Sequence, residues 1–373
     1  MDRRETERLL EMIRQARAEG RPAAIATVVR VKGNAYRREG TRMFVRQDGT
    51  YECALSGGCL EPAVAEVAAQ VIATGEPVVA AYDLADDSIW GLGIGCTGAV
   101  DIRIERLEDD AITREWLAIL ERGDAAVLVT PLSGVSGRLI VGGAGITSGR
   151  LSDATVEQEA TTRAREQLRQ PRPASGPMTI GGADLFFEIA LPPPELVIFG
   201  AGPDAAPVAQ LAWTLGFAVI VVDAREAFLT RDRFPDATLI CAHFSRFAER
   251  VTPSAGAFML VMNHHVERDR ESLRFCLESD AAYIGLLGPR ARYEKLLAGL
   301  AAEGFAPDES KLSRVRSPVG LSLGAETPYE VAVSIIGEIL AVRRGFAGGF
   351  LSGSVRSLHV PDNKDDRRLL ANS

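Results

Sequence analysis

The stretch LVIFGAGPDA (residues 196–205) decides the fold of the second half of the chain. Its apolar start predicts a buried strand, and a G-x-G-x-x-A turn follows that joins this strand to a helix. Gly200 permits the tight turn, Gly202 lets a pyrophosphate approach the backbone, and Ala205 lets the helix pack closely on the strand. This context predicts a Rossmann-type nucleotide-binding domain.

The residues that follow this turn alternate apolar strands with helices, which predicts a parallel sheet covered on both faces. We expect strands at 196–199, 218–222, 238–241, 258–262 and 282–287, and helices at 205–215, 245–249, 267–277, 291–301 and 328–343. The last helix is apolar around most of its circumference over residues 331–340, so it should be buried in a domain interface or at a twofold dimer contact.

Three polar residues of this half are candidate ligand contacts. Asp223 ends the second strand, where a carboxylate can bind a ribose diol. Its charge would repel a 2′-phosphate, so NAD fits better than NADP, although Arg225 could offset that repulsion. His264 follows an apolar strand at the carboxyl edge of the sheet, although a histidine that merely caps the strand is as consistent with the pattern. Asp204 either favours the helix N-terminus or repels a pyrophosphate.

The first half of the chain predicts a separate α+β domain. Three consecutive prolines (192–194) make a stiff break between the halves, because each proline fixes its own φ and disfavours helix in the residue before it. We therefore expect an N-terminal domain at 1–190, a nucleotide-binding domain at 195–345 and a C-terminal tail at 346–373.

Two glycine-rich loops of the first half each contain a cysteine: SGGCLE (56–61) and GIGCTG (93–98). The thiol of Cys59 stands at a helix start, where backbone N–H groups can hold an anion and the helix lowers a thiol pKa. Cys96 could meet it at one site, or both could be small buried residues. A structural zinc site is not expected, because the C-x-x-C spacing is missing. The candidate residues of these loops are Ser56, Gly57, Gly58, Cys59, Glu61 and Cys96.

A basic cluster precedes these loops, and its members are Arg37, Arg38 and Arg42. Arginine forms strong charge-assisted bonds with phosphate, so an anion contact is one interpretation and a solvated surface is the other. The remaining cysteines, Cys53, Cys241 and Cys276, fall in strand or helix patterns and are expected in the core.

Composition excludes several classes of protein. The net charge of −8 argues against a nucleic-acid partner, and no apolar run is long enough for a membrane span. The N-terminus is a charged amphipathic helix without the apolar stretch of a signal peptide. Five cysteines in 373 residues fit a reducing compartment better than a disulfide framework, so we expect a cytoplasmic protein.

Seven motifs in order along the chain resemble the XdhC/CoxI family, accessory proteins of molybdenum hydroxylases such as xanthine dehydrogenase. They lie at residues 33–43, 56–61, 91–96, 199–202, 222–225, 283–288 and 317–328. The family's M-T-H-x-H-x-x-D stretch corresponds to MNHHVERD (262–269) here. His264 keeps the first histidine but Val266 replaces the second, which puts any role that needs both histidines in doubt.

The resemblance implies a carrier rather than an enzyme. Family members bind the molybdenum cofactor, as molybdopterin or its cytosine dinucleotide form, help it gain sulfur from a cysteine desulfurase, and pass it to the apo-hydroxylase; a homodimer is also implied. The rival class is an NAD(P)-dependent oxidoreductase on the same fold, since fold does not decide function. No Tyr-x-x-x-Lys or Ser-His-Asp pattern stands out, which favours the carrier, with NAD as a further candidate ligand.

Overall fold

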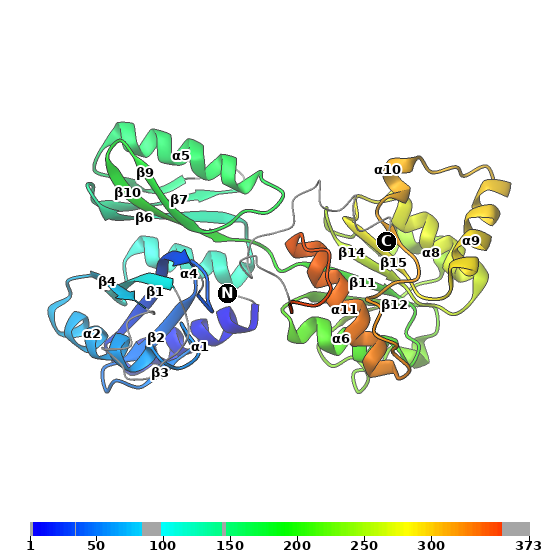
Figure 1. Cartoon of the computed structure of the whole chain (residues 1–373), viewed down its shortest axis with the longest axis horizontal. Coiled ribbons are helices and arrows are strands. Elements are labelled where there is room, and N and C mark those ends of the chain that lie inside the picture. The colour runs from blue at the N-terminus through cyan, green and yellow to red at the C-terminus, as the bar shows by residue number, and fades with distance from the viewer. Residues whose placement is uncertain (1–2, 34, 84–97, 144–146, 353–373) are drawn as a thin grey trace. The chain divides into compact units, whose positions relative to one another are not determined.

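A computed structural model describes residues 3–33, 35–83, 98–143 and 147–352 of the chain. The chain divides into two compact units, residues 1–192 and 193–373 (Figure 1). Each unit is one uninterrupted stretch, and the division falls within the run of prolines that the sequence singles out.

The first unit contains two antiparallel five-stranded sheets. One has the order β3-β2-β1-β5-β4 and the other the order β8-β7-β6-β10-β9. The strands of the first sheet are β1 (Ala23–Gly33), β2 (Arg42–Arg46), β3 (Tyr51–Glu52), β4 (Val78–Asp83) and β5 (Gly98–Arg106). Those of the second are β6 (Ala126–Ser133), β7 (Gly137–Gly142), β8 (Thr147–Leu151), β9 (Gly176–Ile180) and β10 (Ala183–Ala190). This confirms an α+β domain before the Rossmann half.

Helices cover the faces of both sheets because strand residues alternate between two apolar layers. On the first sheet, Ala24 and Ala26 pack against α2 (Glu61–Thr74), while Ala23 and Ile25 join the core beneath α1 (Arg3–Glu19). On the second sheet, Val127 and Val129 face α5 (Ala154–Leu168). Its other face packs against α4 (Ala111–Arg122).

The second unit is a six-stranded parallel sheet of order β13-β12-β11-β14-β15-β16. Its strands are β11 (Glu195–Phe199), β12 (Ala218–Asp223), β13 (Thr238–Cys241), β14 (Phe258–Val261), β15 (Tyr283–Leu286) and β16 (Val315–Arg316). The chain starts in the middle, runs to one edge, returns and continues to the other, which is the doubly wound order of dinucleotide-binding folds. The expected Rossmann fold is thereby confirmed.

Two separate cores lie on the two faces of this sheet. Leu196 and Ile198 pack beneath α6 (Ala205–Thr214) and α11 (Pro328–Arg344), which run side by side (Figure 1). Val197 and Phe199 pack beneath α7 (Phe247–Arg250), α8 (Val266–Glu278) and α9 (Arg290–Ala302). A short helix, α10 (Glu309–Leu312), precedes β16.

The final helix α11 is buried within its own unit. Ala332, Ile335, Ile336 and Ile339 belong to the core shared with α6. Glu338 accepts hydrogen bonds from the Tyr283 hydroxyl (2.7 Å) and the Gly320 N–H (2.8 Å), which tie the helix to β15 and to the loop after β16. Tyr329 and Val333 remain more than half exposed, so the helix is not apolar and buried on every side as the sequence suggests.

Candidate functional site

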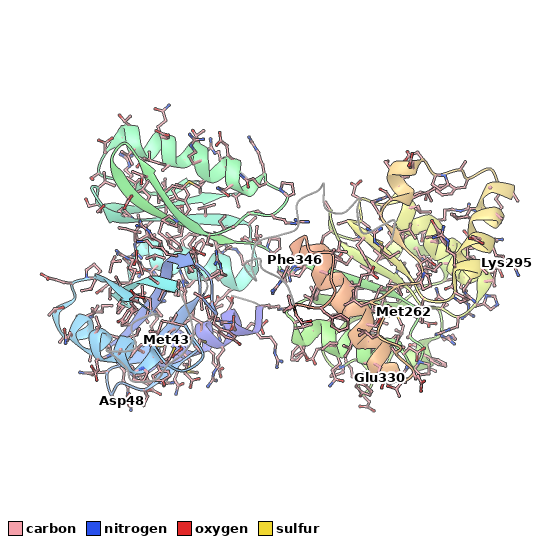
Figure 2. All side chains as sticks on the ribbon, viewed as in Figure 1. Met43, Asp48, Met262, Lys295, Glu330 and Phe346 are labelled. Atoms are coloured by element: carbon pink, nitrogen blue, oxygen red, sulfur yellow. The ribbon has the colours of Figure 1, made fainter. Side chains whose placement is uncertain are left out.

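The carboxyl edge of the parallel sheet reverses its strand order between β11 and β14, which is where such sheets bind ligands. Gly200 directly follows β11 and has a φ of +111°. A Cβ atom on Gly200 would lie 2.6 Å from the carbonyl oxygen of Met262, the residue that directly follows β14 (Figure 2). Only glycine therefore lets the β11–α6 turn sit this close to the end of β14.

The two glycines of the turn should differ sharply in their tolerance of alanine. A Cβ on Gly202 would meet only the His264 ring at 3.7 Å, an ordinary contact. We expect Gly200→Ala to lower the free energy of unfolding by about 2 kcal/mol or more, from backbone strain of about 1–3 kcal/mol plus the overlap. Gly202→Ala should change it by less than about 1 kcal/mol. Urea unfolding of both variants measures the two free energies of unfolding. Equal losses would contradict the conclusion that Gly200, and not Gly202, must be glycine.

Asp223, the expected ribose ligand, is buried and fully engaged with its own domain. Its Oδ2 accepts from the Ala201 N–H (2.8 Å) and from Arg225 Nη2 (2.7 Å). Its Oδ1 accepts from the Arg225 N–H (2.9 Å) and Nε (3.0 Å). Burial alone would raise the pKa of Asp223, but the bonds from Arg225 and Ala201 outweigh it and lower the pKa. An ionised carboxylate has about four acceptor positions, and all are taken.

Arg225 is held in place from two sides. Its guanidinium clamps Asp223 and lies 4.0 Å from the centre of the Phe228 ring. The hydrogen bond to Asp223 raises the pKa of Arg225. A ribose diol at Asp223 would therefore have to displace an internal ion pair, whereas the sequence suggests an open carboxylate.

His264 lies beside the β11–α6 turn, a contact that the sequence did not predict. His264 Nε2 lies 3.1 Å from Asp204 Oδ2, although 60 residues separate them. His264 has a φ of +57°, which is uncommon for a residue with a side chain and brings its ring beside Gly202. Asp204 occupies the N-cap position of α6 but makes no side-chain capping bond, so it does not serve that helix as a cap.

A buried ion pair that sequence reasoning missed fixes the His264 segment. Asp269 is 1% exposed, and it accepts from the Asn263 N–H (3.0 Å) and from Arg292 Nε (3.0 Å). The sequence did contain a signal for this pair, because Asp269 is the aspartate at the end of the stretch that resembles the family's M-T-H-x-H-x-x-D motif. Val266, which stands in place of that stretch's second histidine, begins α8 and is 37% exposed.

The glycine–cysteine loop of the first unit is organised around a serine hydroxyl. Ser56 Oγ accepts hydrogen bonds from three backbone N–H groups, those of Gly58 (3.1 Å), Cys59 (3.1 Å) and Leu60 (3.2 Å). The thiol of Cys59 also points at this oxygen, with Sγ 3.3 Å from Oγ. The N–H groups expected to hold an anion are thus gathered on Ser56, and Cys59 is half-buried beside them.

Glu61 holds this loop against the start of α2. Glu61 is 1% exposed, and its carboxylate accepts hydrogen bonds from Leu55 N–H (2.9 Å), Ser56 N–H (2.7 Å), the Ser56 hydroxyl (2.6 Å) and Leu60 N–H (3.1 Å). Burial would raise the pKa of Glu61, but the hydrogen bonds from the hydroxyl and N–H of Ser56 and from the backbone N–H groups of Glu61 and Leu55 outweigh it and lower the pKa. The side chain that fixes Ser56 therefore stays ionised at neutral pH.

Removing Glu61 should destabilise the first unit, because a buried donor left unpaired costs about 1–3 kcal/mol. We expect Glu61→Ala to lower the free energy of unfolding by about 3 kcal/mol or more at pH 7. A lowered folded-state pKa gives stability above the unfolded-state pKa of about 4.3, and this stability is lost as pH falls. The gap between wild type and Glu61→Ala in thermal unfolding should therefore shrink towards pH 3. The control is Glu66→Gln, an exposed change on the same helix.

The three arginines of the basic cluster bind three different carboxylates. Arg37 bonds to Glu5 and Arg38 lies 3.5 Å from Glu39. Arg42 is 8% exposed and pairs with Glu188 on β10, so it reaches neither solvent nor the glycine–cysteine loop. Arg42 therefore fits neither interpretation of the sequence, an anion contact or a solvated surface, because it joins the two sheets; Arg37 and Arg38 remain partly exposed.

The three cysteines expected in the core differ in their burial. Cys276 is buried, and burial raises the pKa of its thiol. Cys53 is only partly buried and has a φ of +63°, and Cys241 is exposed, so the core expectation is wrong for Cys241. The reason is that β13 is an edge strand. Cys96 lies outside the described residues, so its distance from Cys59 is not part of the structure.

Within the described ranges, no cluster of histidine, cysteine and carboxylate side chains has the geometry of a metal site. No helix in those same ranges is long and apolar enough to cross a bilayer.

Comparison with known proteins follows the two units. Residues 196–339 match the XdhC Rossmann domain, and residues 16–83 match the XdhC and CoxI family. The chain is 32% identical over 337 residues to a probable xanthine dehydrogenase subunit of Bacillus subtilis (strain 168), and the match covers 87% of this chain and 94% of that protein. It is 24% identical over 337 residues to the molybdenum cofactor insertion chaperone PaoD of Escherichia coli (strain K12), covering 90% and 88%.

The fold is also similar to a solved structure, a xanthine dehydrogenase from Bacillus halodurans. The TM-score is 0.74 at 29% sequence identity, over 94% of this chain and 99% of the other. The similarity spans both units and includes a relative above 30% identity, so the chain belongs to the XdhC and CoxI family.

Proposed function

We propose that the protein is an accessory factor that carries the molybdenum cofactor and inserts it into a molybdenum hydroxylase of the xanthine dehydrogenase type. The observation that carries the proposal is the similarity to a molybdenum cofactor insertion chaperone over 90% of this chain. The cofactor would be molybdopterin or its cytosine dinucleotide form. A cysteine desulfurase would supply sulfur to it while it is held.

The residues proposed to hold the metal end of the cofactor and its phosphate belong to the first unit. Cys59 would contact the cofactor or its sulfur, since thiolate suits a soft metal centre, and Cys96 would assist. Ser56 and Glu61 would position the thiol through the hydrogen bonds described above. Among the arginines, Arg37 and Arg38 are partly exposed and suited to a terminal phosphate.

The test uses the full chain purified from a host that makes the cofactor. Oxidation releases a fluorescent pterin, which we expect at a substantial fraction of one per chain. The loaded protein should also activate a purified apo-hydroxylase, and desulfurase should increase that activation. A chain that carries no pterin and leaves the apo-hydroxylase inactive would rule out the carrier role.

An NAD(P)-dependent oxidoreductase is the second candidate, favoured by the doubly wound sheet order and by the turn at Gly200. The engaged carboxylate of Asp223 speaks against it, because a ribose diol finds no open acceptor there. Titration with NADH and NADPH tests this candidate, and micromolar binding of either would favour it.

We also propose a cytoplasmic homodimer. Free thiols persist in a reducing compartment, and the described part of the chain contains four. Tyr329 and Val333 lie one turn apart on α11 with 67% and 53% of their surfaces exposed, as an apolar contact would need. Light scattering should give twice the mass of one chain at micromolar concentration. A mass equal to one chain would contradict the proposed dimer.

A further inference from the structure

The turn between β11 and α6 is poor in the donors that a pyrophosphate requires. Helix N-termini bind phosphate through unpaired backbone N–H groups. Pro203 and Pro207 have none. Three other N–H groups of the turn are already used: Gly200 donates to Val222 O (2.8 Å), Ala201 to Asp223 Oδ2 (2.8 Å) and Ala205 to Gly202 O (3.2 Å).

A carboxylate occupies the same place. Asp204 stands at the start of α6, is 28% exposed at its side chain, and is held by His264 at 3.1 Å instead of capping the helix. A negative charge fixed here repels a pyrophosphate, and the engaged Asp223 offers nothing to a ribose diol. Both features disfavour a dinucleotide at this turn, where an oriented acceptor, Asp204, stands beside the N–H groups.

Asp204 and His264 together present acceptors to whatever binds at this edge of the sheet. His264 uses one of the lone pairs of Oδ2, and an ionised carboxylate has about four. The complement of a carboxylate is a planar group with two adjacent N–H donors, as in the paired bonds between carboxylate and guanidinium. The pyrimidine ring of a pterin carries such an edge, formed by its 2-amino group and N3–H.

We propose that Asp204, oriented by His264, binds the 2-amino and N3–H edge of a pterin ring at the β11/β14 edge. The inference rests on the proposed carrier function for the source of the pterin, and it concerns the residues of the Rossmann unit alone. Guanine carries the same edge, so a guanine nucleoside is the alternative source of this chemistry.

The test is fluorescence titration of the full chain, freed of cofactor, with 6-hydroxymethylpterin. Lumazine is the matched control ligand, because an oxo group replaces the 2-amino donor and would face the carboxylate. We expect lumazine to bind at least tenfold more weakly than the pterin. Asp204→Asn should weaken pterin binding at least tenfold, since an amide NH₂ then meets a donor. Asp236→Asn, an exposed change in the same unit, should leave binding unaltered.

Guanosine and NADH complete the ligand set. Guanosine that binds more tightly than the pterin would replace the pterin as ligand of the same acceptor, and NADH that displaces the pterin would overturn the proposal. Equal binding of pterin by wild type and Asp204→Asn would overturn it as well. Circular dichroism checks the fold, and Asp204→Ser serves if the asparagine variant unfolds.

The experiments distinguish a failure of the proposed carrier function from a failure of the pterin site at Asp204. If free pterin ignores Asp204 while the purified chain still contains and delivers cofactor, only the assignment of Asp204 is lost. If the purified chain contains no pterin and activates no hydroxylase, the carrier function is lost, whatever the titration shows.

Discussion

Cys59→Ser is expected to give a folded protein that retains less than about a tenth of the wild-type pterin and fails to activate its partner. Serine is nearly isosteric with cysteine, and its hydroxyl can keep the contact with Ser56 Oγ that the thiol makes at 3.3 Å. What the substitution removes is the thiolate, which is the species that binds soft metals and reacts with sulfur. The loss should therefore be chemical and not structural.

The measurement compares pterin fluorescence released from wild type and variant, with circular dichroism to show that the fold survives. Cys241→Ser is the matched control, because Cys241 is an exposed thiol of the other unit. A Cys59→Ser protein that keeps its full pterin and still activates the hydroxylase would make Cys59 a packing residue. The carrier proposal would then rest on the rest of the loop.

The largest loss of stability is expected at Arg42. Its guanidinium bonds to Glu188 across the two sheets of the first unit, with both side chains about nine-tenths buried. Burial raises the pKa of Glu188, and Arg42 acts in the opposite direction to hold the charge. Removing one partner of a buried pair costs about 3–5 kcal/mol because the other charge is left uncompensated. We expect a loss in this range for Arg42→Ala and for Glu188→Ala.

The double change Arg42→Met with Glu188→Leu should recover most of this loss, because apolar residues of similar volume replace both charges. Hydrogen exchange of β2 and β10 reports on the first unit without contributions from the second. Arg46→Ala is the control on the same strand; Arg46 lies 3.7 Å from Glu52 near the surface, and such pairs contribute less than about 1 kcal/mol. If Arg42→Ala or Glu188→Ala is no less stable than Arg46→Ala, the ion pair between Arg42 and Glu188 is dispensable for stability.

The strands and helices of the second unit could be predicted because their pattern is local. The apolar run before Gly200 and the helix after it depend only on neighbours in sequence. The structure also has strands that the sequence did not suggest, such as β4 and β9, since Val78 is exposed and β9 starts in a segment rich in proline and glycine. Their pairing with β5 and β10 makes them strands.

The sequence predicted where the candidate residues lie in the fold, but it did not predict their hydrogen-bond and ion-pair partners. Asp223 stands where a ribose ligand belongs, yet Arg225, two residues later, consumes its acceptors. Arg42 looks like a member of a surface cluster until the fold brings Glu188 to it from 146 residues away. Side chains that meet only in the folded structure produce no periodic pattern in the sequence, so these partners could not be predicted from it.

The division of the chain at Pro192 also sets an order of events during synthesis. Domains fold as the ribosome releases them, and at about 5–20 residues per second the second unit takes roughly ten seconds or more to be made. The first unit, with its Cys59 loop already closed by Glu61, has that interval to fold before the second unit is complete. A nascent chain with an unpaired Glu188 would spend the same interval with a less stable first unit, so Arg42 variants should form more aggregate during translation than the wild type.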